Sequence, residues 1–201
     1  MPVLVCHSSR ERITALPTTL PAYLFGRQII GWLLSILLLL PPPLVAAPTA
    51  DEVRVGVLIN LVRFISWPPE VLPPAAPFQL CITEQAPLTA PLRSAVTDRS
   101  IGGHPLQLRS VDPMRERVSD CHLIYFDGRY RSPPPQFQGL SDVPILSVGE
   151  GEGFVQSGMI GITVEAERLR LLMRLQGLYQ ARLQPDPRLL TLVTVVDSAA
   201  P

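Results

Sequence analysis

The sequence predicts an α/β domain in which helices flank a mainly parallel β-sheet and an antiparallel hairpin lies at the C-terminal end. Short apolar segments of strand length recur along the chain. Several are separated by connections of roughly 15 to 35 residues, the length that crossovers between parallel strands require. The last part of the chain differs, because two alternating segments there are joined by a short polar turn.

The first 50 residues are expected to be a secretory signal peptide with its cleavage region. An uncharged apolar run over residues 29–40 follows three arginines and precedes prolines and small residues. A helix of that length spans about 18 Å, which is short of a hydrocarbon core about 30 Å thick. We therefore expect export, cleavage near Ala47 to Ala50 and no stable membrane anchor afterwards. A permanent transmembrane anchor is the alternative.

From residue 51 onward the chain carries 14 arginines, no lysine and 16 aspartate and glutamate residues, a net charge of −2. Such a balance provides no field for a nucleic acid or an anionic membrane surface, so neither is an expected partner. The length of about 150 residues suffices for one self-sufficient core. We predict a single domain over residues 51–195 and a flexible tail over 196–201.

The cysteines, like the signal peptide, predict a location outside the cytosol. Cys6 would be removed with the signal peptide, which leaves Cys81 and Cys121 as a pair. In an oxidising compartment such a pair is expected to form a disulfide. Two separate buried thiols are the alternative.

The first element of the domain is predicted to be an amphipathic helix over residues 51–65. Its apolar residues recur at helical spacing: Val53, Val57, Leu58, Leu61, Phe64 and Ile65. The sequence Trp67-Pro68-Pro69 ends it, because proline lacks the amide that a helix needs and disfavours helical backbone in the residue before it.

Strands and short helices follow in alternation. Residues 78–83 predict a compact strand, residues 88–96 a short helix interrupted early by Pro91, and residues 105–111 a half-buried strand with alternating apolar positions. Residues 121–126 are continuously apolar, which is typical of a central strand covered on both faces.

A further strand is expected over residues 143–148, after a proline run (133–135) that we interpret as a stiff linker. Residues 159–164, a polar turn and the alternation from Leu169 to Leu175 then predict the antiparallel hairpin. A continuous helix over 165–183 is the alternative. With helices on both sides of the sheet, the arrangement is Rossmann-like and three-layered.

Common catalytic motifs are absent from the sequence, including the nucleophile elbow, the phosphate loop and the zinc-protease pattern. Beyond residue 50, His104 and His122 are the histidines that could exchange protons near neutral pH. We expect His104 to be a loop residue and His122 to be a satisfied core or edge residue. We therefore expect no enzyme, no catalytic residue and no cofactor. An enzyme with an unrecognised site around these histidines or the glutamates is the third alternative.

Two further features of the sequence are candidates for binding an ion, a ligand or a partner. Glu150 and Glu152 lie in a glycine-rich segment where a phosphate loop could follow a strand, but their carboxylates would repel phosphate, and a turn fits better. A weak divalent-cation site there would need more oxygen ligands, so no metal site is expected. Trp67 is the candidate for a ligand or partner contact, with packing at the end of the first helix as its alternative role.

The order of these segments resembles the YfiR-like family. The resemblance rests on residues 60–68 (NLVRFISWP), 78–81 (FQLC), 102–106 (GGHPL), 121–126 (CHLIYF), 144–150 (PILSVGE), Gly153-Phe154, 158–160 (GMI) and Leu189-Leu190. It covers about residues 51–195. Cys81 and Cys121 match positions at which family members carry a disulfide.

The resemblance implies a periplasmic α/β domain, often dimeric, whose named member restrains an inner-membrane diguanylate cyclase by acting on that enzyme's periplasmic part. We accordingly expect a homodimer that binds the periplasmic part of such a cyclase or of a sensor kinase, and so controls cyclic-di-GMP and biofilm formation. The alternative is a periplasmic sensor that binds a small molecule near Trp67 or at the carboxyl ends of the parallel strands.

The chain departs from the family pattern at three places. Gly161 stands where an asparagine is frequent, residues 173–176 replace the usual Asn-Leu-Asp-Ala, and Asp186-Pro187 replaces paired serines. Since these positions could shape a binding surface, no interaction residue is transferred from the family.

Overall fold

The computed structural model describes residues 48–196, except residues 117, 139–141 and 167. The expected signal peptide over residues 1–47 and the tail beyond residue 196 lie outside the described residues, so the division into leader, domain and tail stays a prediction. Within the described part, no helix is both long enough and apolar enough to cross a membrane.

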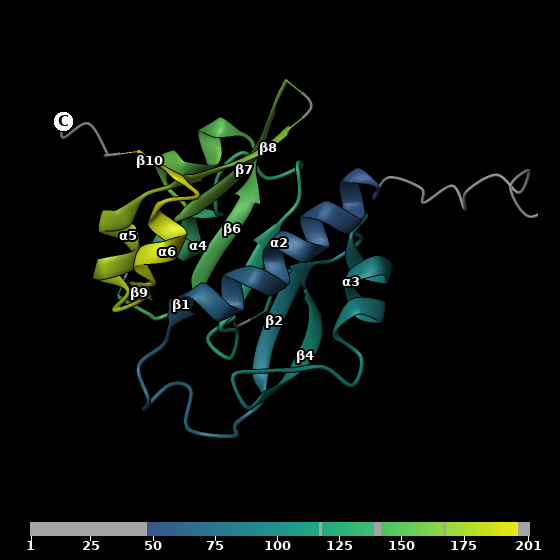
Figure 1. The fold of residues 1–201 in the computed structure, drawn as a ribbon, viewed down its shortest axis with the longest axis vertical. Coiled ribbons are helices and arrows are strands. Elements are labelled where there is room, and N and C mark those ends of the chain that lie inside the picture. The colour runs from purple at the N-terminus through teal and green to yellow at the C-terminus, as the bar shows by residue number, and fades with distance from the viewer. Residues whose placement is uncertain (1–47, 117, 139–141, 167, 197–201) are drawn as a thin grey trace, which may run out of the picture. The chain divides into compact units, whose positions relative to one another are not determined.

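One sheet dominates the described fold, with the strand order β10-β8-β7-β6-β5-β2-β4-β3 (Figure 1). The strands are β2 (Phe78–Thr83), β3 (Ser100–Ile101), β4 (His104–Val111), β5 (Leu123–Phe126), β6 (Leu146–Glu150), β7 (Ile160–Glu165), β8 (Arg168–Met173) and β10 (Thr194–Val195). Strands β4, β2, β5, β6 and β7 are parallel to their neighbours in that row. The predicted fold class is thus confirmed.

The chain reverses its direction of travel across the sheet at β2. From β2 it moves to β4 on one side, and β5 then pairs with the other side of β2. In open α/β sheets such a switch point leaves a crevice at the carboxyl ends of the two strands, because the connecting segments depart to opposite sides. In this protein that crevice lies beyond Thr83 and Phe126.

Helix α2 (Ala50–Phe64) runs along one face of the sheet (Figure 1). It begins with a capping box: the Thr49 hydroxyl accepts from the Glu52 amide, and the Glu52 carboxylate accepts from the Thr49 amide. The residues it buries are Val55, Leu58, Ile59, Leu61 and Val62. The predicted apolar face was partly wrong, since Val53 is 38% exposed. Apolar residues occur around most of this helix, and the position of the sheet decides which are buried.

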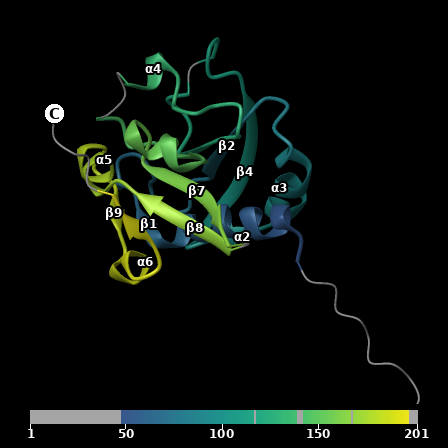
Figure 2. The ribbon, with the colours of Figure 1, turned by 90° about the horizontal axis from the view of Figure 1, so that it is seen from above.

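The two faces of the sheet carry separate cores. Along β2, Leu80 and Ile82 point to the larger core, whereas Cys81 points to the smaller one. The larger core packs under α2 and α3 (Thr89–Val96). The smaller one lies on the side of the short helix α4 (Pro135–Gln138), opposite α2 (Figure 2). Together they form the expected three layers, although the second helical layer is thin.

A disulfide joins Cys81 of β2 to Cys121, two residues before β5, with 5.8 Å between the Cα atoms. Both cysteines are fully buried in the smaller core. The expected pairing is confirmed in the structure. It cross-links the two strands that border the switch point, because β2 and β5 are neighbours in the sheet.

Phe154 is enclosed in the smaller core by two glycines. It lies in the 3₁₀ helix η1 (Glu152–Gln156) and is fully buried. A Cβ atom at Gly149 or Gly158 would lie 2.2 Å from its ring. Substitution of either glycine would displace the ring or the backbone, so these glycines have a packing role.

The C-terminal hairpin is also confirmed. Strands β7 and β8 pair antiparallel from Ile160 with Met173 to Glu165 with Arg168. A helix begins only afterwards, with α5 (Leu175–Gln180). The chain then forms β9 (Gln184–Pro185), which pairs antiparallel with β1 (Ile65–Ser66), and the one-turn helix α6 (Pro187–Leu190). The C-terminal segment is therefore attached directly to the end of α2.

Three local predictions need correction. The strand expected over 143–148 begins at Leu146, after a turn in which the Ile145 amide donates to the Val143 carbonyl. The proline run was expected to be a stiff linker, but Pro133 and Pro134 are buried and Pro135 is the first residue of α4, where its missing amide costs nothing. His104 is the first residue of β4 and not a loop residue.

Candidate functional site

The carboxyl ends of β2, β5 and β6 carry a group of polar side chains that we call the carboxyl-edge cluster. Its members are Arg54, Thr83, Tyr125, Asp127, Arg129 and Glu150. Five of them come from the strands or from the residues that follow β5, and Arg54 reaches them from α2. The cluster borders the switch point, where an open α/β sheet ordinarily binds ligands.

Asp127 is at the centre of the first half of this cluster and is only 4% exposed. The Arg129 side chain donates to both carboxylate oxygens, from Nε at 2.8 Å and from Nη2 at 2.7 Å. The Arg129 amide and the Thr83 hydroxyl each donate at 2.9 Å. Burial alone raises the pKa of Asp127, but these hydrogen bonds outweigh it and the pKa falls below its ordinary value. The carboxylate is therefore ionised and fully bonded.

Arg129 also connects two loops. Its Nη2 atom donates to the Glu84 carbonyl, which follows β2, while its own backbone follows β5. Its side chain is 51% exposed, so solvent screens part of the ion pair with Asp127. The contact fixes the two loops that border the crevice.

The second half of the cluster contains Tyr125, Glu150 and Arg54. The Tyr125 hydroxyl donates to the Glu150 carboxylate, and Arg54 Nε lies 3.6 Å from the same carboxylate. Arg54 Nη1 also donates to Asp51 at 3.0 Å. Burial raises the pKa of Tyr125, and the bond to Glu150 and its charge raise it further, so this phenol stays protonated.

A cavity of about 390 Å³ adjoins the cluster and is bordered by Gln85, Leu88 and Gly128 as well as by its charged groups. The charged side chains already pair with one another, and a carboxylate with four hydrogen bonds is a poor general base. The arrangement is suited to holding loops in place and to polar contacts with a bound molecule.

Trp67 lies at the opposite, amino-terminal edge of the same strands. Its indole Nε1 donates to the His122 carbonyl at 3.2 Å, just before β5. Its ring contacts Phe78, the first residue of β2, edge to face with 4.8 Å between centroids. The two places expected to bind a ligand are thus at different edges, and the structure does not bring Trp67 together with the carboxyl-edge cluster.

Trp67 remains half-buried and borders two open cavities. One, of about 530 Å³, is lined also by Pro68, Tyr179 and Arg182. The other, of about 490 Å³, is lined also by Phe78 and His104. Its role as a contact residue stays a prediction, and its packing reaches the start of β2 as well as the end of α2.

Both histidines of the described part contact the proline-rich loop between β1 and β2. His122 Nδ1 accepts from the Gln79 amide at 2.8 Å, so the ring proton must be on Nε2, which faces the Val71 carbonyl at 3.3 Å. His104 Nδ1 lies 2.9 Å from the Ala76 carbonyl. Burial lowers the pKa of His122, the bond to Val71 opposes this, and His104 lowers it further. His122 is the satisfied edge residue that the sequence predicted.

The two glutamates of the glycine-rich segment separate in the fold. Glu150 is the last residue of β6 and accepts from Tyr125, whereas Glu152 begins η1 and is exposed. Gly151 between them has a φ of +89°, a conformation that side chains rarely adopt. Among the described residues, no group of three or more His, Cys, Asp or Glu side chains is arranged to hold a metal ion.

Sequence reasoning missed the carboxyl-edge cluster almost completely. The sequence indicated the carboxyl ends of the strands as a possible ligand site and singled out Glu150, but it did not single out Thr83, Asp127 or Arg129. The available signal was their position, since polar residues directly after buried parallel strands converge at one edge once the strand order is known. That order is not readable from the residues themselves.

The fold and these edges define an open α/β domain that is cross-linked by a disulfide and has its polar crevice at the switch point. A family model described as YfiR/HmsC-like matches residues 51–194. The chain belongs to this family. A comparison with curated proteins gave no match.

Proposed function

We propose that this protein is a periplasmic regulator that binds and restrains an inner-membrane signalling enzyme, a diguanylate cyclase, and so lowers cyclic-di-GMP. The observation that carries the proposal is the family match over residues 51–194, which spans the described sheet as far as the first residue of β10. Because such a regulator acts by binding, it needs no catalytic residue and no cofactor.

The proposed location agrees with the chemistry of the core. A buried disulfide such as Cys81–Cys121 persists in an oxidising compartment and is rare in the cytosol. The apolar run in the first 50 residues supports export by a cleaved signal peptide. Export places the domain where it can reach the periplasmic part of a membrane enzyme.

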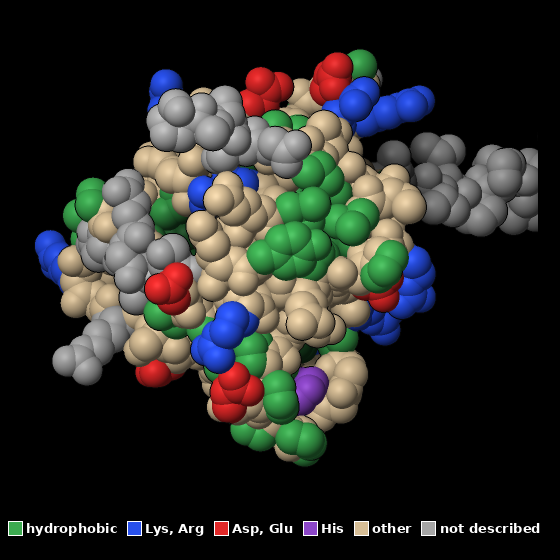
Figure 3. All heavy atoms as spheres, turned by 90° about the vertical axis from the view of Figure 1, so that its left-hand side faces the viewer, with side chains coloured by type: hydrophobic (Ala, Val, Ile, Leu, Met, Phe, Trp, Pro, Cys, Tyr) green, Lys and Arg blue, Asp and Glu red, His purple; other side chains and the backbone are tan. Residues whose placement is uncertain are grey.

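The proposed contact surface for the enzyme lies on the C-terminal elements. Three large apolar side chains are exposed there: Tyr179 in α5 (58%), Leu192 after α6 (68%) and Val195 in β10 (38%). Figure 3 shows the side of the molecule toward these elements, where hydrophobic side chains gather with charged ones around them. Apolar groups surrounded by charge are typical of protein-binding surfaces.

The first experiment measures cellular cyclic-di-GMP in a strain that lacks the gene and in strains complemented with the full chain or with a form without residues 1–50. We expect a rise on deletion that only the full chain reverses. An unchanged level on deletion would contradict restraint of a cyclase.

A second experiment tests the contact surface with matched substitutions. Leu192→Asp should abolish the complementation, because a charge at an exposed apolar contact resists desolvation. Val164→Asp, at a residue of similar exposure (59%) on the β7–β8 hairpin, is the control and should complement fully. Equal behaviour of the two variants would place the contact elsewhere.

Binding of a small molecule near Trp67 is the second candidate function, in which the protein acts as a sensor, for example on a sensor kinase. The observation in its favour is the half-buried indole between two open cavities. Trp67 is the one tryptophan after residue 50, so its fluorescence reports on both cavities. A saturable change in that fluorescence on addition of periplasmic extract would support a sensor; no change would count against it.

We further propose that the protein is a homodimer, as the family resemblance implies. Sedimentation of the purified protein tests this directly. A single species of monomer mass at micromolar concentration would refute it.

A further inference from the structure

Arg174 is unusual among the arginines that the structure describes. Every other described arginine is either largely exposed or within 4.0 Å of a carboxylate. Arg174 is partly buried, and its recorded hydrogen-bond acceptors are backbone carbonyls: Gly158 at 2.9 Å from Nε and Ser157 at 3.0 Å from Nη2. Burial lowers its pKa, but a guanidinium stays charged. A partly desolvated cation therefore has no counter-charge among the described residues.

The two carbonyl contacts leave several donors unused. A guanidinium has five N–H groups, of which these bonds occupy two. Gly177 explains how the group is positioned, because a Cβ atom there would lie 3.1 Å from Nη2 and 3.2 Å from Nε. The absence of a side chain at 177 thus lets the guanidinium lie against the first turn of α5 in a fixed orientation.

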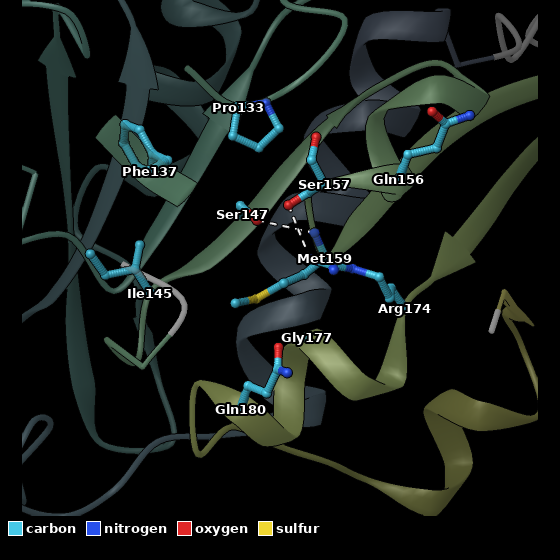
Figure 4. A pocket seen from close by; sticks show the side chains of 10 residues that line it. All are labelled: Pro133, Phe137, Ile145, Ser147, Gln156, Ser157, Met159, Arg174, Gly177 and Gln180. Atoms are coloured by element: carbon cyan, nitrogen blue, oxygen red, sulfur yellow. Dashed lines mark hydrogen bonds between the residues drawn. The ribbon is translucent and has the colours of Figure 1, made fainter. Parts of the chain in front are cut away.

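The remaining donors of Arg174 border a cavity of about 250 Å³ (Figure 4). Ser147 lies in its wall, 7% exposed, with its hydroxyl oxygen accepting from the Met159 amide at 3.1 Å. The hydroxyl proton is then free to donate. Two kinds of donor, one of them charged, are thus available in the same cavity.

The opposite side of the cavity is apolar. Figure 4 shows Pro133, Phe137 and Ile145 across from Arg174, with Met159 between. This volume is slightly below the usual range for ligand sites, so the cavity suits a molecule of small size. Apolar walls opposite a planar, bidentate cation favour an organic carboxylate over an inorganic anion, because phosphate has no apolar part to bury.

We propose that this cavity binds a small organic carboxylate, with the carboxylate on Arg174 and Ser147 and a compact hydrocarbon part against Phe137 and Ile145. The site is separate from both Trp67 cavities and from the carboxyl-edge cluster, as it shares no lining residue with them. It does not depend on control of a cyclase, because binding is measured on the purified protein.

Calorimetric titration with benzoate tests the proposal, with benzamide and inorganic phosphate as controls. Benzamide has nearly the same shape without the charge, and phosphate has the charge without the apolar part. We expect saturable one-site binding of benzoate, and binding of both controls weaker by at least about tenfold. Absence of benzoate binding at millimolar concentration, or equal binding of either control, would overturn the proposal.

Substitutions locate the site. Arg174→Gln should weaken benzoate binding by at least about tenfold, because the charged hydrogen bonds are lost. Gln180→Glu adds a negative charge at an exposed residue of the lining, so it should weaken binding even if the first variant folds poorly. Arg170→Gln is the matched control, since that arginine is 56% exposed, pairs with Glu165 and lies outside the cavity. Unchanged binding in Gln180→Glu and in folded Arg174→Gln would refute the site, as would an equal loss in Arg170→Gln.

Discussion

At the carboxyl edge of the sheet, strands β2, β5 and β6 end among charged side chains that pair with one another. At the amino edge, β2 and β5 begin among aromatic rings and hydrogen bonds between side chains and backbone. Asp127 with Arg129 is typical of the first edge, and Trp67 with His122 of the second. The comparison teaches that one sheet can hold its loops by two kinds of contact that respond to different changes in pH.

The difference follows from which groups are desolvated. A buried carboxylate is stable only with full compensation, so the carboxyl edge needs an arginine and a hydroxyl around Asp127. The neutral ring of His122 needs only one donor and one acceptor from the backbone. Mild acid is therefore expected to disturb the amino edge, whereas the carboxyl edge should resist until carboxylates are protonated.

The largest effect is expected from loss of the disulfide between the two strands that both edges share. Cys81→Ser should lower the free energy of unfolding by up to about 4 kcal/mol, as expected for a cross-link across 40 residues. Thermal melting of wild type and variant, each with and without reductant, measures it. Reduction should lower the wild type to the level of the variant and leave the variant nearly unchanged. A wild type that melts at the same temperature after reduction would contradict this.

The second largest effect is expected from removing Arg129, the charge partner of Asp127 at the carboxyl edge. Arg129→Met leaves the Asp127 carboxylate buried with fewer donors, and we expect a loss of about 2 kcal/mol, since half of Arg129 is exposed. Urea unfolding at neutral pH measures the loss. Arg170→Met is the control, because its pair with Glu165 is exposed on both sides. Equal losses of stability in the two variants would mean that the burial of Asp127 does not increase the effect of losing its partner.

The same variant sharpens the pH comparison. The lowered pKa of Asp127 stabilises the fold above its unfolded pKa of 3.8, and this contribution is lost as the pH falls through the still lower folded value. In Arg129→Met the pKa of Asp127 should rise, so acid unfolding should begin at higher pH than in the wild type. Unfolding monitored by circular dichroism during acid titration shows the midpoint.

The amino edge should lose stability at milder pH than the carboxyl edge. His122 has a folded pKa below its ordinary value of 6.5, so as the pH falls the unfolded chain binds the proton first. Stability is then present above pH 6.5 and falls as the pH drops toward the folded pKa, by at most about 1.4 kcal/mol per pH unit. Urea unfolding between pH 7.5 and 5 measures the slope. His122→Gln should remove most of the slope and His104→Gln only a small part, because His104 makes the smallest contribution to the lowered pKa of His122. The reverse result would assign the effect to His104.

The smallest effect is expected at the start of α2, the helix that brings Arg54 to the carboxyl edge. Thr49→Ala removes the capping hydroxyl and should cost about 1 kcal/mol. Thermal melting measures the change, and Thr97→Ala, whose exposed hydroxyl donates to a carbonyl at the end of α3, is the control. A cost in the control equal to that of Thr49→Ala would argue against a special role for the capping box.

The sequence by itself determined the fold class, the succession of the main strands along the chain, the C-terminal hairpin and the pairing of Cys81 with Cys121. These depend on local patterns: apolar runs predict buried strands, alternation predicts the hairpin, and the two cysteines after residue 50 allow only one bridge with each other. The family assignment rests on the same order of segments. The sequence also located His122 at the start of a strand as a satisfied residue, because a histidine next to an apolar run is surrounded by strand backbone.

Only the tertiary structure decided which polar groups meet. Thr83 and Asp127 are 44 residues apart in the chain, and Trp67 and His122 are 55 apart, so no local periodicity connects them. The position of β5 beside β2 places Asp127 at one edge and Trp67 at the other. The lack of a carboxylate beside Arg174 among the described residues was likewise invisible in the sequence, because the burial of Arg174 depends on α5 and the loop of Ser157 and Gly158 packing at one place.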